Sequence, residues 1–323
     1  MNHFQPLALL LFVGSTPLSL VAQKSPFTSA VPFITITTDA RSSGMGEAGV
    51  ALSQEAFAVF HNPSAGLFAK EGCYIATARS SRAKDNVLFS LGGYYRFSTG
   101  QSLAAGIRHF SHPRLSITDD QGNILEKFTP REWALDIAYG RLLTANMGTS
   151  LTFRYIHSDL GSFSGSSPGN AFAFDAGLFY RKEIPTLEGA HWALGIQLAN
   201  IGSKIKYLEE SYSLPGRITA GVSAHVPFSD IHQLHGTLQT GYHWSSSATS
   251  YVDAGIGMEY IFRNYAVLRG GYHAANKDKG DESYATAGCG LRLNLFHADF
   301  SHGFLPSDSS PKNRWNLSIG FSL

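Results

Sequence analysis

The sequence is dominated by segments of about ten residues in which apolar side chains alternate with polar or small ones, as in membrane β-strands. Trp133, Leu135 and Ile137, for example, alternate with Ala134 and Asp136. A repeat of two residues indicates a strand with one apolar face, because successive side chains point to opposite sides of a sheet. Strands of this length with a dyad repeat are what a transmembrane β-barrel requires. The pattern therefore predicts an all-β fold, an antiparallel barrel.

The alternation begins near Cys73 and predicts fourteen strands. They lie at 73–80, 86–97, 101–111, 131–142, 147–157, 170–182, 190–201, 216–226, 232–244, 250–262, 264–273, 283–294, 295–303 and 313–323. Tight turns at one end, such as 98–100 and 263–264, contrast with long polar loops at the other. The long loops are 112–130, 158–169, 202–215, 274–282 and 304–312. Outer-membrane barrels have short periplasmic turns and longer extracellular loops, so we expect these five loops to face outward.

The connection at 182–189 is the exception, since it is long for the short-turn end. A soluble β-sandwich is the alternative fold, but a sandwich has no reason to sort its loops in this way. Charged residues make up 15% and aromatic residues 12% of the chain, which suits either fold. The net charge of +1 provides no basic surface for nucleic acid.

Residues 1–22 have the pattern of a secretory signal peptide. The apolar run at 7–13 is too short to span a membrane, and small residues at 20–22 precede an expected cleavage before Gln23. A buried N-terminal strand is the other interpretation. We therefore expect a signal peptide at 1–22, an N-terminal plug segment at 23–72 and a transmembrane barrel at 73–323, in the outer membrane.

The segment before the first strand lacks the alternation and is rich in glycine. Its candidate structural residues are Asp39, Arg41, Gly44, Gly46, Gly49, Asn62 and Pro63. Residues 53–60 predict a short helix with Ser53 as its N-cap. The segment is too small to be a domain, yet its apolar residues need burial, so it predicts a plug inside the lumen. GMGEAG at 44–49 approximates a phosphate loop, but no βαβ unit surrounds it, and close packing of glycine against the barrel wall is the better interpretation.

Four charged residues fall on the non-lipid face of four successive predicted strands. They are Arg108, Asp136, Arg154 and Asp175. If each hairpin is symmetric about its turn, these side chains lie at similar heights and form a cross-strand ladder in the lumen. Such a ladder braces a barrel, so we interpret it as structural.

No catalytic signature of the hydrolase, metalloprotease, nucleotide-binding or calcium-binding kind occurs in the sequence. We therefore expect no enzyme, no catalytic residue, no metal ligand and no cofactor. The thirteen histidines show no ligand spacing. Cys73 and Cys289 fall on the first and twelfth predicted strands, which are not neighbours, so free thiols are expected.

Several motifs, in order along the chain, resemble the PorV/PorQ family of type IX secretion proteins, and PorV more than PorQ. They are AVPFITI at 30–36, DAR at 39–41, GMG at 44–46, GVA at 49–51, NP at 62–63, REWA at 131–134, RYIHSDL at 154–160, ANIGSKI at 199–205, RGGY at 269–272 and DFS at 299–301. The resemblance covers nearly the whole chain after the signal peptide. It implies a FadL-like fold, a fourteen-stranded barrel with an N-terminal plug.

The resemblance also implies a function in secretion. Members of the family work with the type IX translocon, receive cargo that carries a C-terminal signal domain, and pass it to the attachment machinery at the surface. Cargo is expected to bind the long loops, and the candidate residues are Asp119, Asp120, Gly161, Ser164, Lys279 and Asp281. The implied partners are translocon and attachment-complex proteins, secreted cargo and outer-membrane lipid. The chain is short for this family, which leaves open a paralogue with one client or a member that has lost the shuttle role.

Three other functions stay open at this point. A FadL-like transporter of hydrophobic small molecules would need an apolar pocket under the loops and a kink or gap in the wall. A scaffold without a ligand would tolerate substitutions in its loops. A general-diffusion porin is the weakest alternative, because a plug inside a fourteen-stranded barrel leaves little room for water.

Overall fold

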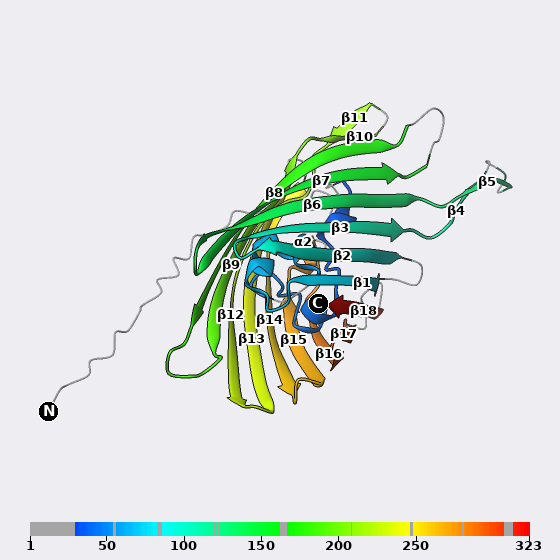
Figure 1. Ribbon diagram of the computed structural model, residues 1–323. Coiled ribbons are helices and arrows are strands. Elements are labelled where there is room, and N and C mark those ends of the chain that lie inside the picture. The colour runs from blue at the N-terminus through cyan, green and yellow to red at the C-terminus, as the bar shows by residue number, and fades with distance from the viewer. Residues whose placement is uncertain are drawn as a thin grey trace, which may run out of the picture.

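The chain forms one closed antiparallel β-barrel of fourteen strands, seen from the side in Figure 1. The computed structural model describes residues 30–53, 56–82, 86–118, 121, 123–161, 167–207, 209–245, 248–279, 281–306 and 313–323. The expected signal peptide at 1–22 lies outside the described residues. Each barrel strand pairs with its neighbour along the chain, and β1 closes the barrel on β18 through pairs from Tyr74–Ser322 to Ser81–Trp315.

All fourteen predicted barrel strands are present, and their ends differ by only a few residues from the predicted ones. The strands are β1 (Cys73–Ser81), β2 (Val87–Ser98), β3 (Gln101–Ser111), β6 (Arg131–Thr144), β7 (Met147–Asp159), β8 (Gly169–Glu183), β9 (His191–Gly202), β12 (Gly216–Ser229), β13 (His232–Ser245), β14 (Ala248–Phe262), β15 (Ala266–Ala274), β16 (Tyr284–Leu293), β17 (Phe296–Phe304) and β18 (Asn313–Ser322). The fold class predicted from the alternation is therefore confirmed. Cys73 and Cys289 lie on β1 and β16, which are not neighbours.

Two additional hairpins and a short helix lie in the long loops and were not predicted. The hairpins are β4 (Leu115–Thr118) with β5 (Ile124–Phe128), and β10 (Ile205–Tyr207) with β11 (Glu210–Tyr212). The helix is η3 (Lys277–Lys279), in the loop between β15 and β16. Strands of three to five residues are too short to display an alternation, which is why the pattern missed them. We call the end of the barrel that carries these loops the long-loop end, and the opposite end the short-turn end.

The outer surface of the barrel is apolar on every strand. Large side chains such as Ile75 on β1, Phe153 on β7, Ile256 on β14 and Phe321 on β18 point outward and are exposed. A continuous apolar belt of this kind far exceeds the patches that soluble proteins expose, and lipid is the environment that it suits. Among the described residues, no helix is long and apolar enough to cross a membrane.

Residues 30–72 form an irregular segment with four short helices: η1 (Pro32–Thr35), α1 (Ala40–Gly44), α2 (Ala58–His61) and η2 (Pro63–Phe68). The segment lies against the inner side of the wall (Figure 1). Phe33 packs on Phe110 near the long-loop end, whereas Phe68 packs on Phe179 near the short-turn end. The segment therefore runs along the inside of the barrel before it enters β1.

The helix expected after Ser53 was placed wrongly. Phe57, not Ser53, occupies the N-cap of α2, and the Ser53 carbonyl accepts a hydrogen bond from Arg41. The capped helix is instead α1, where the Asp39 carboxylate accepts a bond of 2.7 Å from the backbone N–H of Ser42. The difference comes from a tertiary contact. The Ser53 carbonyl accepts from the buried Arg41 guanidinium, and the helix begins only at Ala58.

Glycine lets the segment approach the wall at backbone distance. Gly46 has φ +69°, and a Cβ there would lie 2.5 Å from the carbonyl oxygens of Ile256 and Tyr272. On the wall, a Cβ at Gly257 would lie 2.5 Å from the Cβ of Met45. GMGEAG at 44–49 is thus a close-packing motif of the segment and the wall, in line with the interpretation made from the sequence.

We predict that Gly46→Ala lowers the free energy of unfolding by about 2 kcal/mol or more, from the left-handed backbone and the clash combined. The measurement is urea-induced unfolding in lipid vesicles, followed by the gel mobility shift on heating. Gly236→Ala is the matched control, because a Cβ at Gly236 meets nothing within 4 Å. Equal stability of the two variants would contradict the proposed close packing.

Candidate functional site

The ladder residues predicted from the sequence lie together near the long-loop end, in a continuous chain of ion pairs. Arg108 donates to Asp136 at 3.0 Å, and Arg154 donates to Asp136 at 2.5 Å and to Asp175 at 2.7 Å. All four side chains are at most 2% exposed. The alternating charges neutralise one another, which is the condition for burying ions at such low exposure.

The ladder also holds the N-terminal segment, which the sequence did not indicate. Arg108 donates its remaining NH1 group to the carbonyl of Ile34 at 2.7 Å. Asn200 on β9 accepts from Arg154 and donates its backbone N–H to Asp175 at 2.7 Å. Asn200 has φ +63° and lies where the β8–β9 register shifts, so it forms a bulge in the wall beside the ladder. The sequence carried no signal for this bulge.

A second buried charge network, missed by the sequence analysis, binds the segment to the opposite wall. Arg41 of α1 donates to Glu259 on β14 at 2.8 Å, and Arg269 on β15 donates to Glu259 at 2.7 Å and to Asp299 on β17 at 2.6 Å. The criterion that found the ladder, charged residues facing inward on successive strands, would have found Glu259 and Arg269, which are direct register partners. It could not have found their pairing with Arg41, because Arg41 is outside the sheet.

The other motif residues of the segment serve its own fold. Burial raises the pKa of the Asp39 carboxyl, but the hydrogen bond and charge of His61, together with hydrogen bonds from Ser42, outweigh burial and leave the pKa below its usual value of 3.8. Asp39 is thus ionised at neutral pH. Asn62 donates its amide to the Leu178 carbonyl at 2.9 Å, and Pro63 begins η2. Each residue connects one turn of the segment to the next or to the wall.

At the long-loop end an apolar cluster covers the ladder. Phe33 and Ile34 of η1 pack there with Phe110 of β3, and Ile205 and Leu214 reach in from the loop between β9 and β12. This loop therefore folds over the lumen rather than extending away from it.

Tyr207 of β10 fastens the same loop by a hydrogen bond of 2.7 Å to Ser158. Burial, together with the charge of Glu132, raises the pKa of the Tyr207 hydroxyl to about 12. The hydroxyl is therefore a neutral donor at any physiological pH.

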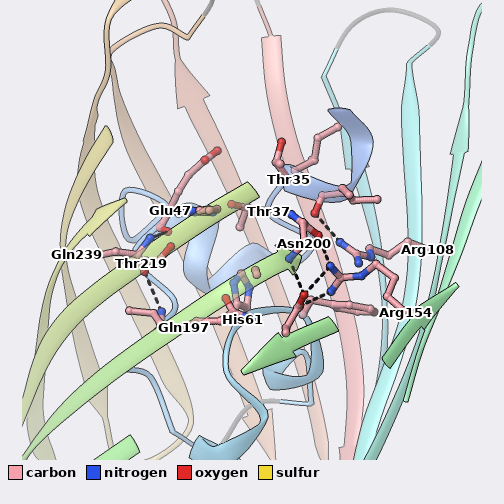
Figure 2. A pocket seen from close by; sticks show the side chains of 17 residues that line it. Thr35, Thr37, Glu47, His61, Arg108, Arg154, Gln197, Asn200, Thr219 and Gln239 are labelled. Carbon is pink, nitrogen blue, oxygen red and sulfur yellow. Dashed lines mark hydrogen bonds and ion pairs between the residues drawn. The ribbon is translucent and has the colours of Figure 1, made fainter. Parts of the chain in front are cut away.

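A small pocket, partly open to solvent, lies between the segment and the wall (Figure 2). Arg108, Arg154 and Asn200 line one side, and Glu47 and Gln239 line the other. The lining is mostly polar, and its charged side chains are paired within the protein. Water and small polar solutes suit such a lining, whereas an apolar ligand would displace water from the charged groups of the pocket.

Among the candidate cargo-binding residues, the three that the structure describes lie in two separate loops. Gly161 follows β7 and has φ +115°, whereas Lys279 and Asp281 lie between β15 and β16, and β9, β12, β13 and β14 separate β8 from β15. Lys279 donates to the Ser250 carbonyl at 3.2 Å. Asp119, Asp120 and Ser164 lie outside the described residues.

The family model described as Type IX secretion system protein PorV matches residues 20–234. The chain belongs to this PorV family. The match spans the N-terminal segment, the ladder and the β10–β11 hairpin. No curated protein sequence matches the chain.

Solved structures share the fold of this PorV family member at low sequence identity. The toluene transporter TbuX of Ralstonia pickettii is 14% identical with a TM-score of 0.58, over 88% of this chain and 97% of that one. The monoaromatic hydrocarbon channel CymD is 12% identical with a TM-score of 0.57, over 88% and 97%. A FadL homologue of Pseudomonas aeruginosa is 12% identical with a TM-score of 0.51, over 92% and 100%.

These comparisons, with the apolar belt, place the chain in the outer membrane as a FadL-like barrel of the PorV family. The resemblance noted from the sequence motifs is confirmed. The family and the fold are those of a secretion or transport barrel rather than those of an enzyme class.

We predict that Arg154→Met lowers the free energy of unfolding by about 3–5 kcal/mol, because it leaves Asp136 and Asp175 buried with too little positive charge. Urea-induced unfolding in lipid vesicles measures the change. Glu183→Gln, which breaks the exposed Arg181–Glu183 pair, is the control and should change stability by about 1 kcal/mol at most. Similar losses in the two variants would show that the ladder does not brace the barrel.

Proposed function

We propose that this protein is an outer-membrane accessory protein of the type IX secretion system, which binds cargo with a C-terminal signal domain and carries it from the translocon to the attachment machinery. The observation that carries the proposal is the family match over residues 20–234. The partners that follow are translocon and attachment-complex proteins and the secreted cargo. No covalent chemistry is needed for this function.

The long-loop end is the side on which cargo is proposed to bind. The β4–β5 hairpin continues the wall beyond β3 and β6, as Figure 1 shows, and its Leu115 and Ile124 are exposed. Exposed apolar side chains on a projecting two-stranded hairpin favour contact with another protein, because a hairpin alone buries little of its surface. The β10–β11 hairpin, in contrast, is partly folded over the lumen.

The N-terminal segment is proposed to act as a plug. Charge networks fix it to two sides of the wall through Arg108 and Arg41. Movement of the whole segment would separate buried ions from their partners, which is costly. The function proposed therefore uses the outer rim of the barrel rather than a path through it.

Transport of a hydrophobic small molecule is the second candidate, since TbuX and CymD share the fold. A lateral path for such a molecule would need an irregularity in the wall, and the bulge at Asn200 is one, which favours transport. Two observations count against it: Asp175 and Arg154 fill the lumen side of the bulge, and the pocket beneath the loops has a polar lining. An apolar ligand retained in the lumen through purification would reverse this preference.

We predict that the purified full chain has negligible conductance in planar bilayers, because the plug occupies the lumen. A general-diffusion porin inserted in the same membranes is the control for channel detection. Large and stable single-channel steps from this chain would contradict the plug.

We also predict that replacing residues 115–128 by a short Gly-Ser linker abolishes cargo capture. The assay is affinity purification from gently solubilised outer membranes, followed by mass spectrometry. The matched control shortens the connection at 184–190, the long one at the short-turn end, and should leave capture unchanged. Both variants should keep the heat-dependent gel shift of a folded barrel.

Normal capture of proteins with C-terminal signal domains by the 115–128 variant would contradict binding at this hairpin. Absence of any translocon protein or cargo in the wild-type eluate would contradict the proposed secretion function itself.

A further inference from the structure

The loop between β15 and β16 returns to the rim of the barrel at a cluster of four potential metal ligands. Asp253 lies on β14, His273 lies at the end of β15, and Asp281 lies in the loop itself. One ligand atom of each of these three residues lies within 4.8 Å of the others. His243 on β13 adjoins them, with its Nε2 atom 3.0 Å from an Asp253 carboxylate oxygen. Three strands and one loop thus converge on one point.

The chemistry of the cluster suits a divalent transition metal ion. Imidazole nitrogen and carboxylate oxygen are the ligands that zinc takes from His and Asp, at about 2.0–2.2 Å. Ligand atoms at that distance in a tetrahedron lie roughly 3.3 Å apart, and the His273 Nε2 and Asp281 Oδ2 atoms are already 3.1 Å apart. Only small side-chain shifts would bring all three ligands around one ion.

Burial and hydrogen bonding hold the side chains of the cluster in positions that suit metal binding. The Asp253 side chain is 9% exposed, and its Oδ1 atom is buried without a hydrogen-bond partner. Because an unpaired carboxylate oxygen in a buried site is costly, a cation is the partner that it lacks. The His243 and Tyr251 rings stack, with their centroids 4.4 Å apart and an interplanar angle of 3°. This stacking fixes the His243 imidazole, which contacts the other carboxylate oxygen of Asp253. Metal-binding carboxylates are commonly held by such outer hydrogen bonds.

The charges that face the cluster leave room for a cation. Arg217 is the nearest fixed positive charge, but its NH2 atom is 3.6 Å from Asp253, a loose contact. Two carboxylates therefore face one guanidinium. Lys279 is turned to the Ser250 carbonyl, and Glu47 of the N-terminal segment pairs with Arg82 at 3.1 Å. An added divalent ion would bond directly to the carboxylates and neutralise their charge better than the loosely paired Arg217 guanidinium does.

We propose that Asp253, His273 and Asp281 bind a divalent transition metal ion such as zinc, with His243 as the outer partner of Asp253. Asp281 is the only one of these residues outside a strand, so the ion would fix the β15–β16 loop to the barrel rim. The sequence analysis expected no metal ligand, because the four residues are spaced by 10, 20 and 8 positions and meet only when neighbouring strands pair. The site is independent of the proposed secretion function.

The test uses the full chain, freed of any affinity tag and of metal, in detergent. Zinc chloride is titrated in competition with a chromogenic chelator, and bound zinc is counted by elemental analysis. Wild type should bind one equivalent of zinc, and Asp281→Asn and Asp253→Asn should each weaken binding at least tenfold. His112→Gln is the matched control, because His112 forms a His–carboxylate pair at 2.8 Å with Glu132 near the same end, and among the described residues this pair belongs to no cluster of three ligands.

Asp281→Asn is the decisive variant, since its half-exposed loop position leaves the barrel strands intact. Proteolysis within the β15–β16 loop provides a second readout: zinc should slow cleavage in wild type and in His112→Gln but not in Asp281→Asn. Absence of saturable zinc binding in wild type, or equal affinity in wild type and Asp281→Asn, would overturn the proposal. Failure of cargo capture would leave this result unaffected, because the two assays share no reagent.

Discussion

Closure of the sheet is the constraint on which the rest of the structure depends. In the hydrocarbon of a membrane each backbone N–H and C=O must find a partner within the protein, and only the pairing of β1 with β18 removes the last open edges. Fourteen strands enclose more space than the inward side chains can fill. The polar lumen and the segment that occupies it follow from this one requirement.

The N-terminal segment is held against the inner wall by two different kinds of contact. Glycines such as Gly46 and Gly257 let backbone meet backbone, and buried ion pairs through Arg41 and Arg108 fix the position along the barrel. Close packing provides area without direction, whereas a guanidinium that donates to both a carboxylate and a backbone carbonyl accepts one arrangement. Together these contacts hold the segment against the wall.

The contrast between a shared barrel and a different interior explains how one fold serves different functions. TbuX and CymD share the barrel at 12–14% identity, so the architecture alone does not decide what passes through it or binds to it. In this PorV family member, Asn200 in the wall bulge is hydrogen-bonded to Asp175 and Arg154. The pocket beneath the loops has a mostly polar lining. The proposed metal site would fix one of the loops at the long-loop end to the barrel rim.

The sequence by itself determined the barrel, its strands and the ladder, because each depends on a two-residue period that local alternation displays directly. Arg108, Asp136, Arg154 and Asp175 could be placed at one height from hairpin symmetry alone. Only the tertiary structure decided which residues outside the sheet meet it: the pairing of Arg41 with Glu259, the cap at Asp39 rather than Ser53, and the meeting of Asp253 with Asp281. Alternation along a single strand displays none of these contacts, because each depends on how the N-terminal segment and the loops pack against the wall.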